Sequence, residues 1–143
     1  MRHIQLELRA KEYNNAKSLY ETILTVFTSN INIISYIVIE YAEFMIKYFR
    51  DIEFAKKLLK TYFESSVYNE YLFLSYLEFF INHVEYKENS KDSKETYEDF
   101  VGIICNGLGR AFDNTPEKYK SLKKIVQKYL RDYIVSIYSI KAA

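Results

Sequence analysis

Apolar residues recur along the chain at the three- and four-residue spacing of amphipathic helices, in seven segments separated by short polar stretches. The segment after Asn32, for example, carries Tyr36, Ile39, Phe44 and Ile46. The pattern predicts an all-α protein of about seven helices joined by short turns. The predicted helices cover 1–11, 15–28, a segment that begins at 32 and includes Ile46, a segment around 54–62, 69–86, a segment that begins at 94 and includes Phe112, and 116–140.

Polar side chains and turn residues mark where these helices begin and end. Residues 12–14 and 50–51 are predicted turns, and the polar, mixed-charge stretch 87–93 is predicted to be a solvated loop. A side-chain oxygen at a helix start can accept a hydrogen bond from an unpaired backbone amide, and Pro116 in the first helical position strengthens that signal. The predicted caps are Asn32, Asp51, Asn69 and Thr115.

One segment of the chain returns after 35 residues, because Tyr36–Ile46 is repeated as Tyr71–Ile81 with identical Tyr, Tyr, Glu, Phe and Ile at matching offsets. The predicted helix that follows the first copy in the sequence also has a counterpart. Its Ala55-Lys56-Lys57-Leu58 has Ala, Lys and Leu at the same positions as Ala16-Lys17-Ser18-Leu19. A period of this length fits one helical hairpin of a solenoid. We therefore predict antiparallel helical hairpins stacked as an α–α superhelix, a class that usually serves as a binding surface.

The aromatic residues of the repeat allow two interpretations. Tyr and Phe rings can stack on nucleic-acid bases, but they also fill the space between packed helices. Their recurrence at helical core spacing favours packing between hairpins. The predicted core set is Tyr36, Tyr41, Phe44, Tyr71, Tyr76 and Phe79.

The repeat has a recognisable order: an aromatic residue, a Tyr five positions later, a Glu-Phe pair, and then an Ala-Lys-x-Leu helix. This order resembles the half-a-tetratricopeptide (HAT) repeat of RNA-processing scaffolds. The matching residues are Tyr36, Tyr41, Ala42, Glu43, Phe44, Ala55, Lys56 and Leu58, then Tyr71, Tyr76, Glu78 and Phe79. With Arg2–Arg9, Asn14–Leu19 and Leu108–Phe112, the order is similar to the carboxy-terminal region of the pre-mRNA-processing factor 39 family, splicing factors associated with the U1 small nuclear ribonucleoprotein.

That resemblance implies a HAT/TPR-like solenoid, a location in the nucleus, and dimerisation through the carboxy-terminal repeats. Proteins of the family are several times longer than this chain. Residues 1–143 are therefore expected to form a single HAT-repeat domain from the carboxy-terminal part of a longer protein.

Composition and charge exclude several other classes. The formal net charge is +1, so no overall field draws the chain to nucleic acid or to a membrane surface. Three Gly and one Pro are too few for the turns of a β-sandwich or barrel. No apolar run approaches the roughly 20 residues of a membrane span. The single cysteine, Cys105, excludes an internal disulfide and is compatible with a reducing compartment.

No residue pattern indicates catalysis. His3 and His83 have no Cys or carboxylate arrangement around them that forms a metal-ligand set. Cys105 lies among apolar neighbours and is predicted to be a buried, inert thiol. The three glycines within 102–109 lack the features of a phosphate-binding loop, and are expected to permit close helix contact or to weaken their helix. We predict no enzyme activity, no cofactor and no metal.

The last predicted helix carries two candidate interaction sets. Its Lys and Arg residues outnumber its Asp and Glu residues. These cations are expected either to form a solvated helix face or to contact a partner, which would be RNA phosphates or an acidic protein. The basic set is Lys120, Lys124, Lys128 and Arg131. The end of the helix is apolar nearly all round, which predicts docking on protein or folding back over the last hairpin. The apolar set is Tyr129, Tyr133, Ile134, Ile137 and Tyr138.

The leading hypothesis is a non-enzymatic protein-interaction scaffold of pre-mRNA splicing. Its expected partners are proteins of the splicing machinery, with dimerisation either with itself or with a related HAT protein. One alternative is a HAT scaffold with the same fold that acts in mRNA 3′-end cleavage and polyadenylation. Another is a helical repeat module that binds RNA through Lys120, Lys124 and Lys128. No membrane partner is expected.

Overall fold

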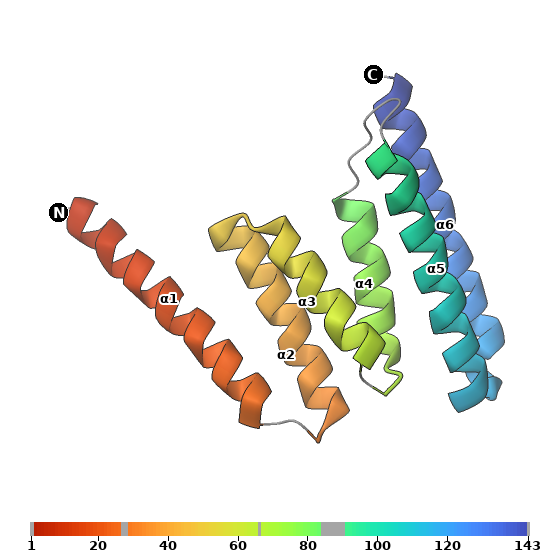
Figure 1. The fold of residues 1–143 in the computed structure, drawn as a ribbon, viewed down its shortest axis with the longest axis horizontal. Helices are drawn as coiled ribbons and strands as arrows, with labels where there is room; N and C mark the ends of the chain where they lie inside the picture. The colour runs from red at the N-terminus through yellow and green to blue at the C-terminus, as the bar shows by residue number, and fades with distance from the viewer. Residues whose placement is uncertain (1, 27–28, 66, 84–90, 143) are drawn as a thin grey trace. The chain divides into compact units, whose positions relative to one another are not determined.

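A computed structural model describes residues 2–26, 29–65, 67–83 and 91–142, and the side chains of 11–26, 29–65, 67–83 and 98–136. Within these ranges the chain has six α-helices, one π-helical turn, one 3₁₀ turn and no strand (Figure 1). The predicted all-α class is therefore confirmed. The chain divides into two compact units, Met1–Asn69 and Glu70–Ala143, each described by itself below. The single domain over 1–143 and the superhelical stacking stay predictions.

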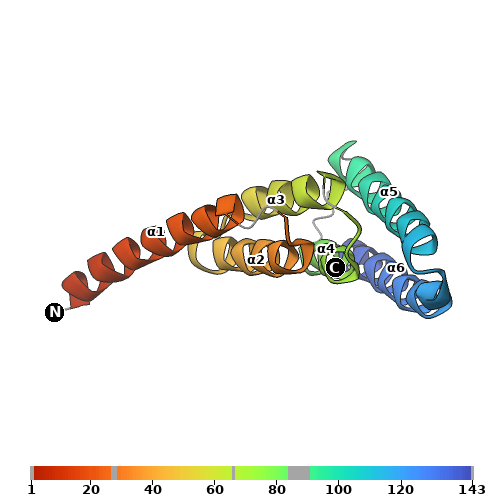
Figure 2. The same ribbon diagram turned by 90° about the horizontal axis from the view of Figure 1, so that it is seen from below.

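The first unit contains three α-helices: α1 (Arg2–Val26), α2 (Ile31–Phe44) and α3 (Ile52–Ser65). α2 packs against both α1 and α3. Figure 2 shows α2 and α3 side by side as a hairpin. A π-helical turn, η1 (Met45–Phe49), continues α2 and ends at Arg50.

The predicted turn at residues 50–51 is confirmed. Arg50 adopts the left-handed conformation with φ 53° and ends the helical run. The Asp51 carboxylate then accepts a hydrogen bond from the backbone amide of Phe54 at 3.0 Å. Asp51 is therefore the N-cap of α3, as the sequence predicts.

The predicted turn at residues 12–14 is wrong, because α1 is one continuous helix. Its polar Glu12, Asn14 and Asn15 are exposed, so they form the solvated face of a helix rather than a break. Tyr13 stacks on Tyr48 with ring centroids 4.4 Å apart, which fixes this part of α1 against the end of α2. Because the first two predicted helices are one helix, the described part of the chain has six α-helices instead of the seven predicted.

The cap of α2 lies two residues before the predicted one. Asn30 Oδ1 accepts from the backbone amides of Asn32 and Ile33, at 3.2 and 3.3 Å. Asn32 uses its side-chain oxygen differently, because Asn69 Nδ2 donates to Asn32 Oδ1 at 3.1 Å. This second bond ties the start of α2 to the segment after α3.

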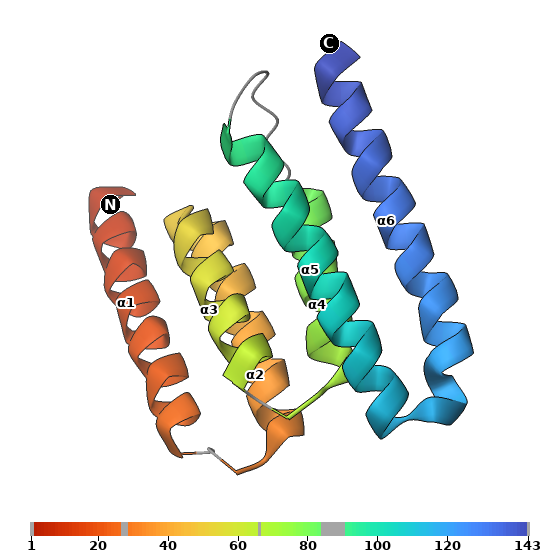
Figure 3. The ribbon, with the colours of Figure 1, turned by 45° about the vertical axis from the view of Figure 1, so that its right-hand side comes forward.

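The second unit contains α4 (Glu70–Asn82), α5 (Lys91–Asn114), the 3₁₀ turn η2 (Pro116–Lys118) and α6 (Tyr119–Ala142). The three α-helices pack against one another, and Figure 3 shows α5 and α6 running antiparallel. The loop predicted at 87–93 is wrong for 91–93, which belong to α5, while 87–90 lie outside the described residues.

The helix start at Thr115 and Pro116 is confirmed in position but not in mechanism. Pro116 occupies the first position of η2, and Thr115 precedes it. The Thr115 hydroxyl, however, donates to the carbonyl oxygen of Ala111 at 3.1 Å instead of accepting from an amide of η2. Thr115 therefore closes the end of α5 rather than capping the next helix.

Candidate interaction surfaces

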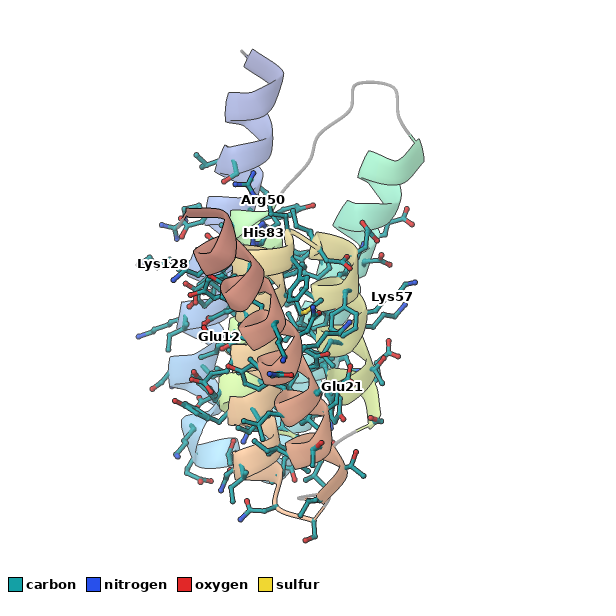
Figure 4. The ribbon with its side chains drawn as sticks, turned by 90° about the vertical axis from the view of Figure 1, so that its left-hand side faces the viewer. Glu12, Glu21, Arg50, Lys57, His83 and Lys128 are labelled. Carbon is teal, nitrogen blue, oxygen red and sulfur yellow. The ribbon has the colours of Figure 1, made fainter. Side chains whose placement is uncertain are left out.

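The basic set of α6 lies opposite the buried face of its helix. Leu122, Val126 and Tyr133 are buried and point into the second unit. Four exposed cations recur at three- and four-residue intervals on the other side, and Lys128 is labelled in Figure 4. We call this row the basic stripe: Lys120, Lys124, Lys128 and Arg131.

No described carboxylate lies within the 4.0 Å ion-pair distance of any cation in the basic stripe. The exposed large apolar side chains on the described part of α6 are aliphatic, namely Ile125 and Val135. Nucleic-acid bases stack on aromatic rings, so this surface offers charge without a stacking platform. The stripe is therefore suited to phosphates or carboxylates rather than to bases.

The residues of the predicted apolar set of α6 differ in how far they are buried. Tyr133 is buried and stacks on Phe100 of α5 with ring centroids 4.3 Å apart. Its prediction as a protein-binding residue is therefore wrong, because the ring is used inside the unit. Ile134 is half-buried.

Tyr129 is also half-buried and faces α4. Burial raises the pKa of its hydroxyl, and the negative charges of Glu78 and Asp132 add to the increase. Ile137 and Tyr138, which complete the predicted set, lie outside the described side chains. Protein binding by Tyr129 and Ile134 stays a prediction.

The aromatic residues of the first unit form one connected cluster. Tyr20 stacks on Tyr41 at 5.2 Å, and Lys17 Nζ lies 5.5 Å from the ring centroid of Phe54. The rings contact one another across three helices and η1, and only Tyr48 and Phe49, at 42% and 38%, are exposed among the described rings of the cluster. The cluster comprises Tyr13, Tyr20, Tyr41, Phe44, Tyr48, Phe49 and Phe54.

Core packing is confirmed for part of the predicted aromatic set. Tyr41 and Tyr76 are each 1% exposed, and Phe79 is buried. Tyr36 and Tyr71 are each 52% exposed, so the prediction that they are core residues is wrong. Residues five positions apart on a helix lie about 140° apart around its axis. The two tyrosines of each copy therefore cannot face the same core.

Tyr41 is held in the core by a polar contact as well as by rings. Its hydroxyl donates to Glu21 Oε1 on α1 at 2.8 Å, and Glu21 is labelled in Figure 4. Burial raises the pKa of Tyr41 well above its usual value, and the hydrogen bond to Glu21 raises it further. The contact joins α1 to α2 through a neutral hydroxyl and a carboxylate.

The sequence interpretation missed that each copy of the repeat leaves one Tyr and one Glu exposed on its helix. Tyr36 and Glu43 are exposed on α2, and their counterparts Tyr71 and Glu78 are exposed on α4. Glu40 joins the first copy, because the Tyr36 hydroxyl donates to Glu40 Oε1 at 3.3 Å. The residues on α2 belong to the first unit and those on α4 to the second, so they are two separate sets. The five-residue offset between the two tyrosines of each copy was the signal that could have revealed the exposed tyrosines.

Glu40 also acts on the neighbouring helix. Burial raises the pKa of Tyr20 on α1, and the nearby charge of Glu40 is the next largest cause. The ring contacts of Tyr20 are with Tyr41 and Phe44 of α2.

The described side chains contain no group of three or more His, Cys, Asp or Glu residues that could hold a metal ion. His83 packs against the Phe79 ring at 5.0 Å, while the side chain of His3 is outside the described set. Cys105 is exposed, so the prediction of a buried thiol is wrong: it lies on the side of α5 away from α4 and α6. No helix in the described part of the chain has the length and hydropathy needed to cross a membrane.

Comparison of the chain with protein-family models, with curated proteins and with solved structures gives no match.

Proposed function

We propose that the chain is a non-enzymatic protein-interaction scaffold built from helical repeats, working in pre-mRNA splicing. The observation that carries the proposal is the matched burial of α2 and α4. Val38 and its counterpart Phe73 are both 0% exposed, and Tyr41 and Tyr76 are both 1% exposed. The repeat thus has the same inner side in both copies.

The outer side of the repeat matches too, since Tyr36 and Tyr71 share an exposure of 52%. A segment that keeps both its buried and its exposed positions behaves as a structural unit. Arrays of such units present extended surfaces to partner proteins. This supports a binding module rather than an enzyme.

The resemblance of the repeat to HAT proteins supports splicing as the process. The alternative is a HAT scaffold of mRNA 3′-end cleavage and polyadenylation, which uses the same fold. The RNA and proteins that co-purify with the tagged chain distinguish the two. Enrichment of the U1 small nuclear ribonucleoprotein is expected, and enrichment of cleavage factors alone would contradict splicing.

Dimerisation through the carboxy-terminal helices is part of the same proposal. Exposed Ile125 and Val135, with half-buried Tyr129 and Ile134, leave apolar surface on α6 for a second chain. Light scattering at high micromolar concentration is expected to show a dimer. A strict monomer that also ignores related HAT proteins would contradict this part.

RNA binding by the basic stripe is a second candidate, favoured by four exposed cations without a described carboxylate in ion-pair range. Binding of phosphates by such cations weakens steeply as salt rises. Replacement of Lys120, Lys124 and Lys128 by Glu is expected to abolish RNA binding if the stripe is used. Absence of measurable binding at low salt would eliminate this candidate.

A further inference from the structure

Two neighbouring aromatic rings are exposed where α2 continues into η1. Tyr48 is 42% exposed and Phe49 is 38% exposed, whereas the other described rings of the aromatic cluster are half-buried or buried. A π-helical turn closes its hydrogen bonds one residue later than an α-helix, so it brings the residue five positions ahead close to the starting one. Both rings therefore contact Phe44, with centroids 5.1 and 5.8 Å from its own. The π turn thus presents two adjacent rings at the surface.

The Tyr48 ring is supported by the first helix. Tyr13 of α1 stacks on it with ring centroids 4.4 Å apart and ring planes 29° apart. A ring that is held in place loses little conformational freedom when a flat molecule stacks on it. The supported and exposed Tyr48 ring is therefore suited to stacking with a further planar group.

Two lysines lie over the exposed rings. Lys47 Nζ is 5.2 Å from the centroid of Tyr48, and Lys17 Nζ is 6.0 Å from the centroid of Phe49. No described carboxylate lies within 4.0 Å of either ammonium group. The rings are therefore bordered by positive charge that the described side chains leave without an ion pair.

Arg50, labelled in Figure 4, adds a third cation directly after Phe49. Its φ of 53° is a conformation that favours Gly, so an Arg side chain is costly at this position. No described group forms a hydrogen bond or ion pair with its guanidinium, and the adjacent Asp51 serves as the N-cap of α3. Backbone strain of this kind gathers at functional sites. A use of the guanidinium in binding accounts for its presence where packing does not.

We propose that these two rings and three cations bind single-stranded RNA. Bases stack on exposed aromatic rings while Lys and Arg contact the phosphates between them. A base that stacks on Tyr48 displaces the Lys47 ammonium from the ring, and the displaced ammonium reaches a phosphate. A purely acidic peptide pairs with the cations but has no planar group for the rings, so RNA matches more of this surface. We call it the ring–cation site: Lys17, Lys47, Tyr48, Phe49 and Arg50.

The ring–cation site is separate from the basic stripe. It lies in the first unit, whereas the basic stripe lies on α6 of the second. The described part of α6 exposes cations without large aromatic rings, while the ring–cation site exposes both. The inference goes beyond the scaffold proposal and does not depend on it, since the proteins that co-purify with the chain test the scaffold independently.

The test measures binding of a fluorescein-labelled oligouridine to the full chain by anisotropy at several salt concentrations. Tyr48→Ala is expected to weaken binding at least about fivefold, the scale of one lost base stack, without changing the salt dependence. Tyr48→Phe keeps the ring and is expected to retain most of the affinity. Lys47→Gln is expected to reduce the slope of log affinity against log salt by about 0.7, the contribution of one phosphate contact.

Arg50→Gly separates loss of the site from misfolding. It removes the cation and relieves the backbone strain, so it is expected to weaken RNA binding in a chain that is more stable than the parent. Two controls lie outside the site: Tyr71→Ala removes an exposed ring of α4, and Lys60→Gln removes an exposed cation of α3. Both are expected to leave oligouridine binding unchanged.

Replacement of the lysines of the basic stripe by Glu distinguishes the two RNA surfaces. The affinity that depends on Tyr48 is expected to persist in that variant. Loss of all binding there, with no effect of Tyr48→Ala or Arg50→Gly in the parent, would overturn the inference. Absence of oligouridine binding at low salt would overturn it as well. Binding of a labelled polyglutamate peptide as tight as that of oligouridine would also overturn it, because the cations would then recognise an acidic protein.

Discussion

The ring of Phe73 lies directly over Gly107, so that a Cβ atom added to Gly107 would come within 2.2 Å of Phe73 Cε1. Phe73 is 0% exposed and cannot swing aside without disturbing the core of the second unit. Gly107→Ala is therefore expected to lower the free energy of unfolding by about 1–3 kcal/mol, the usual cost of overpacking a core. Urea denaturation measures the loss.

The matched control for that substitution is Gly109→Ala on the same helix. A Cβ atom at Gly109 meets nothing within 4 Å. Ala is a better helix former than Gly, so this variant is expected to gain about 0.5–1 kcal/mol. A stabilising effect at both positions would show that Phe73 does not press on Gly107.

The left-handed backbone of Arg50 predicts a stabilising substitution. Its φ of 53° is unfavourable for a residue with a Cβ atom but free for glycine. Arg50→Gly is expected to raise the free energy of unfolding by about 0.5–1 kcal/mol. Arg50→Ala removes the same side chain and keeps the strain, so thermal denaturation should show no gain for it. Equal gains in the two variants would contradict the explanation.

The hydrogen bond from Tyr41 to Glu21 predicts a stability that depends on pH. Tyr41→Phe is expected to cost about 1 kcal/mol near neutral pH, because the bond between α1 and α2 is lost. The pKa of Tyr41 is raised in the folded state, so the folded chain holds this proton more tightly than the unfolded chain. The stabilisation is therefore present below about pH 10, the ordinary Tyr pKa, and is lost above it.

The measurement compares denaturation of the parent and Tyr41→Phe at about pH 8 and at rising pH above about 10. The difference between the two chains is expected to shrink as pH rises, because only the parent has this titrating group. A difference that stays constant or widens would mean that Glu21 does not favour the neutral hydroxyl.

Ser35 is expected to be replaceable with a gain in stability. Its side chain is 0% exposed, and no described residue makes a hydrogen bond with its Oγ. Burial of an unpaired hydroxyl costs about 1–3 kcal/mol, so Ser35→Ala should recover part of that cost. Ser18→Ala at an exposed position of α1 controls for helix propensity alone. A larger gain for Ser18 than for Ser35 would show that the Ser35 hydroxyl has a partner.

Helix type and most helix ends were predictable from the sequence, because they depend on local spacing and capping. The continuity of α1 was not, since it depends on the stacking of Tyr13 on Tyr48, residues distant in the chain. The exposure of Cys105 depends on which side of α5 the other helices cover, which its apolar neighbours do not reveal.

The candidate surfaces were predictable to different degrees. Lys120 and Lys124 of the basic stripe were found because charges on one helical stripe are visible in the sequence. The repeat predicts Tyr36 in the core if packing alone is considered, but its angular distance from Tyr41 places it on another side of the helix. The burial of Tyr133 cannot be predicted from α6 alone, because its stacking partner, Phe100, lies on another helix.

The most direct test of the account is purification of the tagged chain from nuclear extract of its source cells, with sequencing of the bound RNA and mass spectrometry of the bound proteins. A splicing scaffold is expected to recover U1 small nuclear RNA and its proteins together with a second copy or a related HAT protein. Recovery of cleavage and polyadenylation factors without U1 RNA, or of no specific protein, would contradict the central claim.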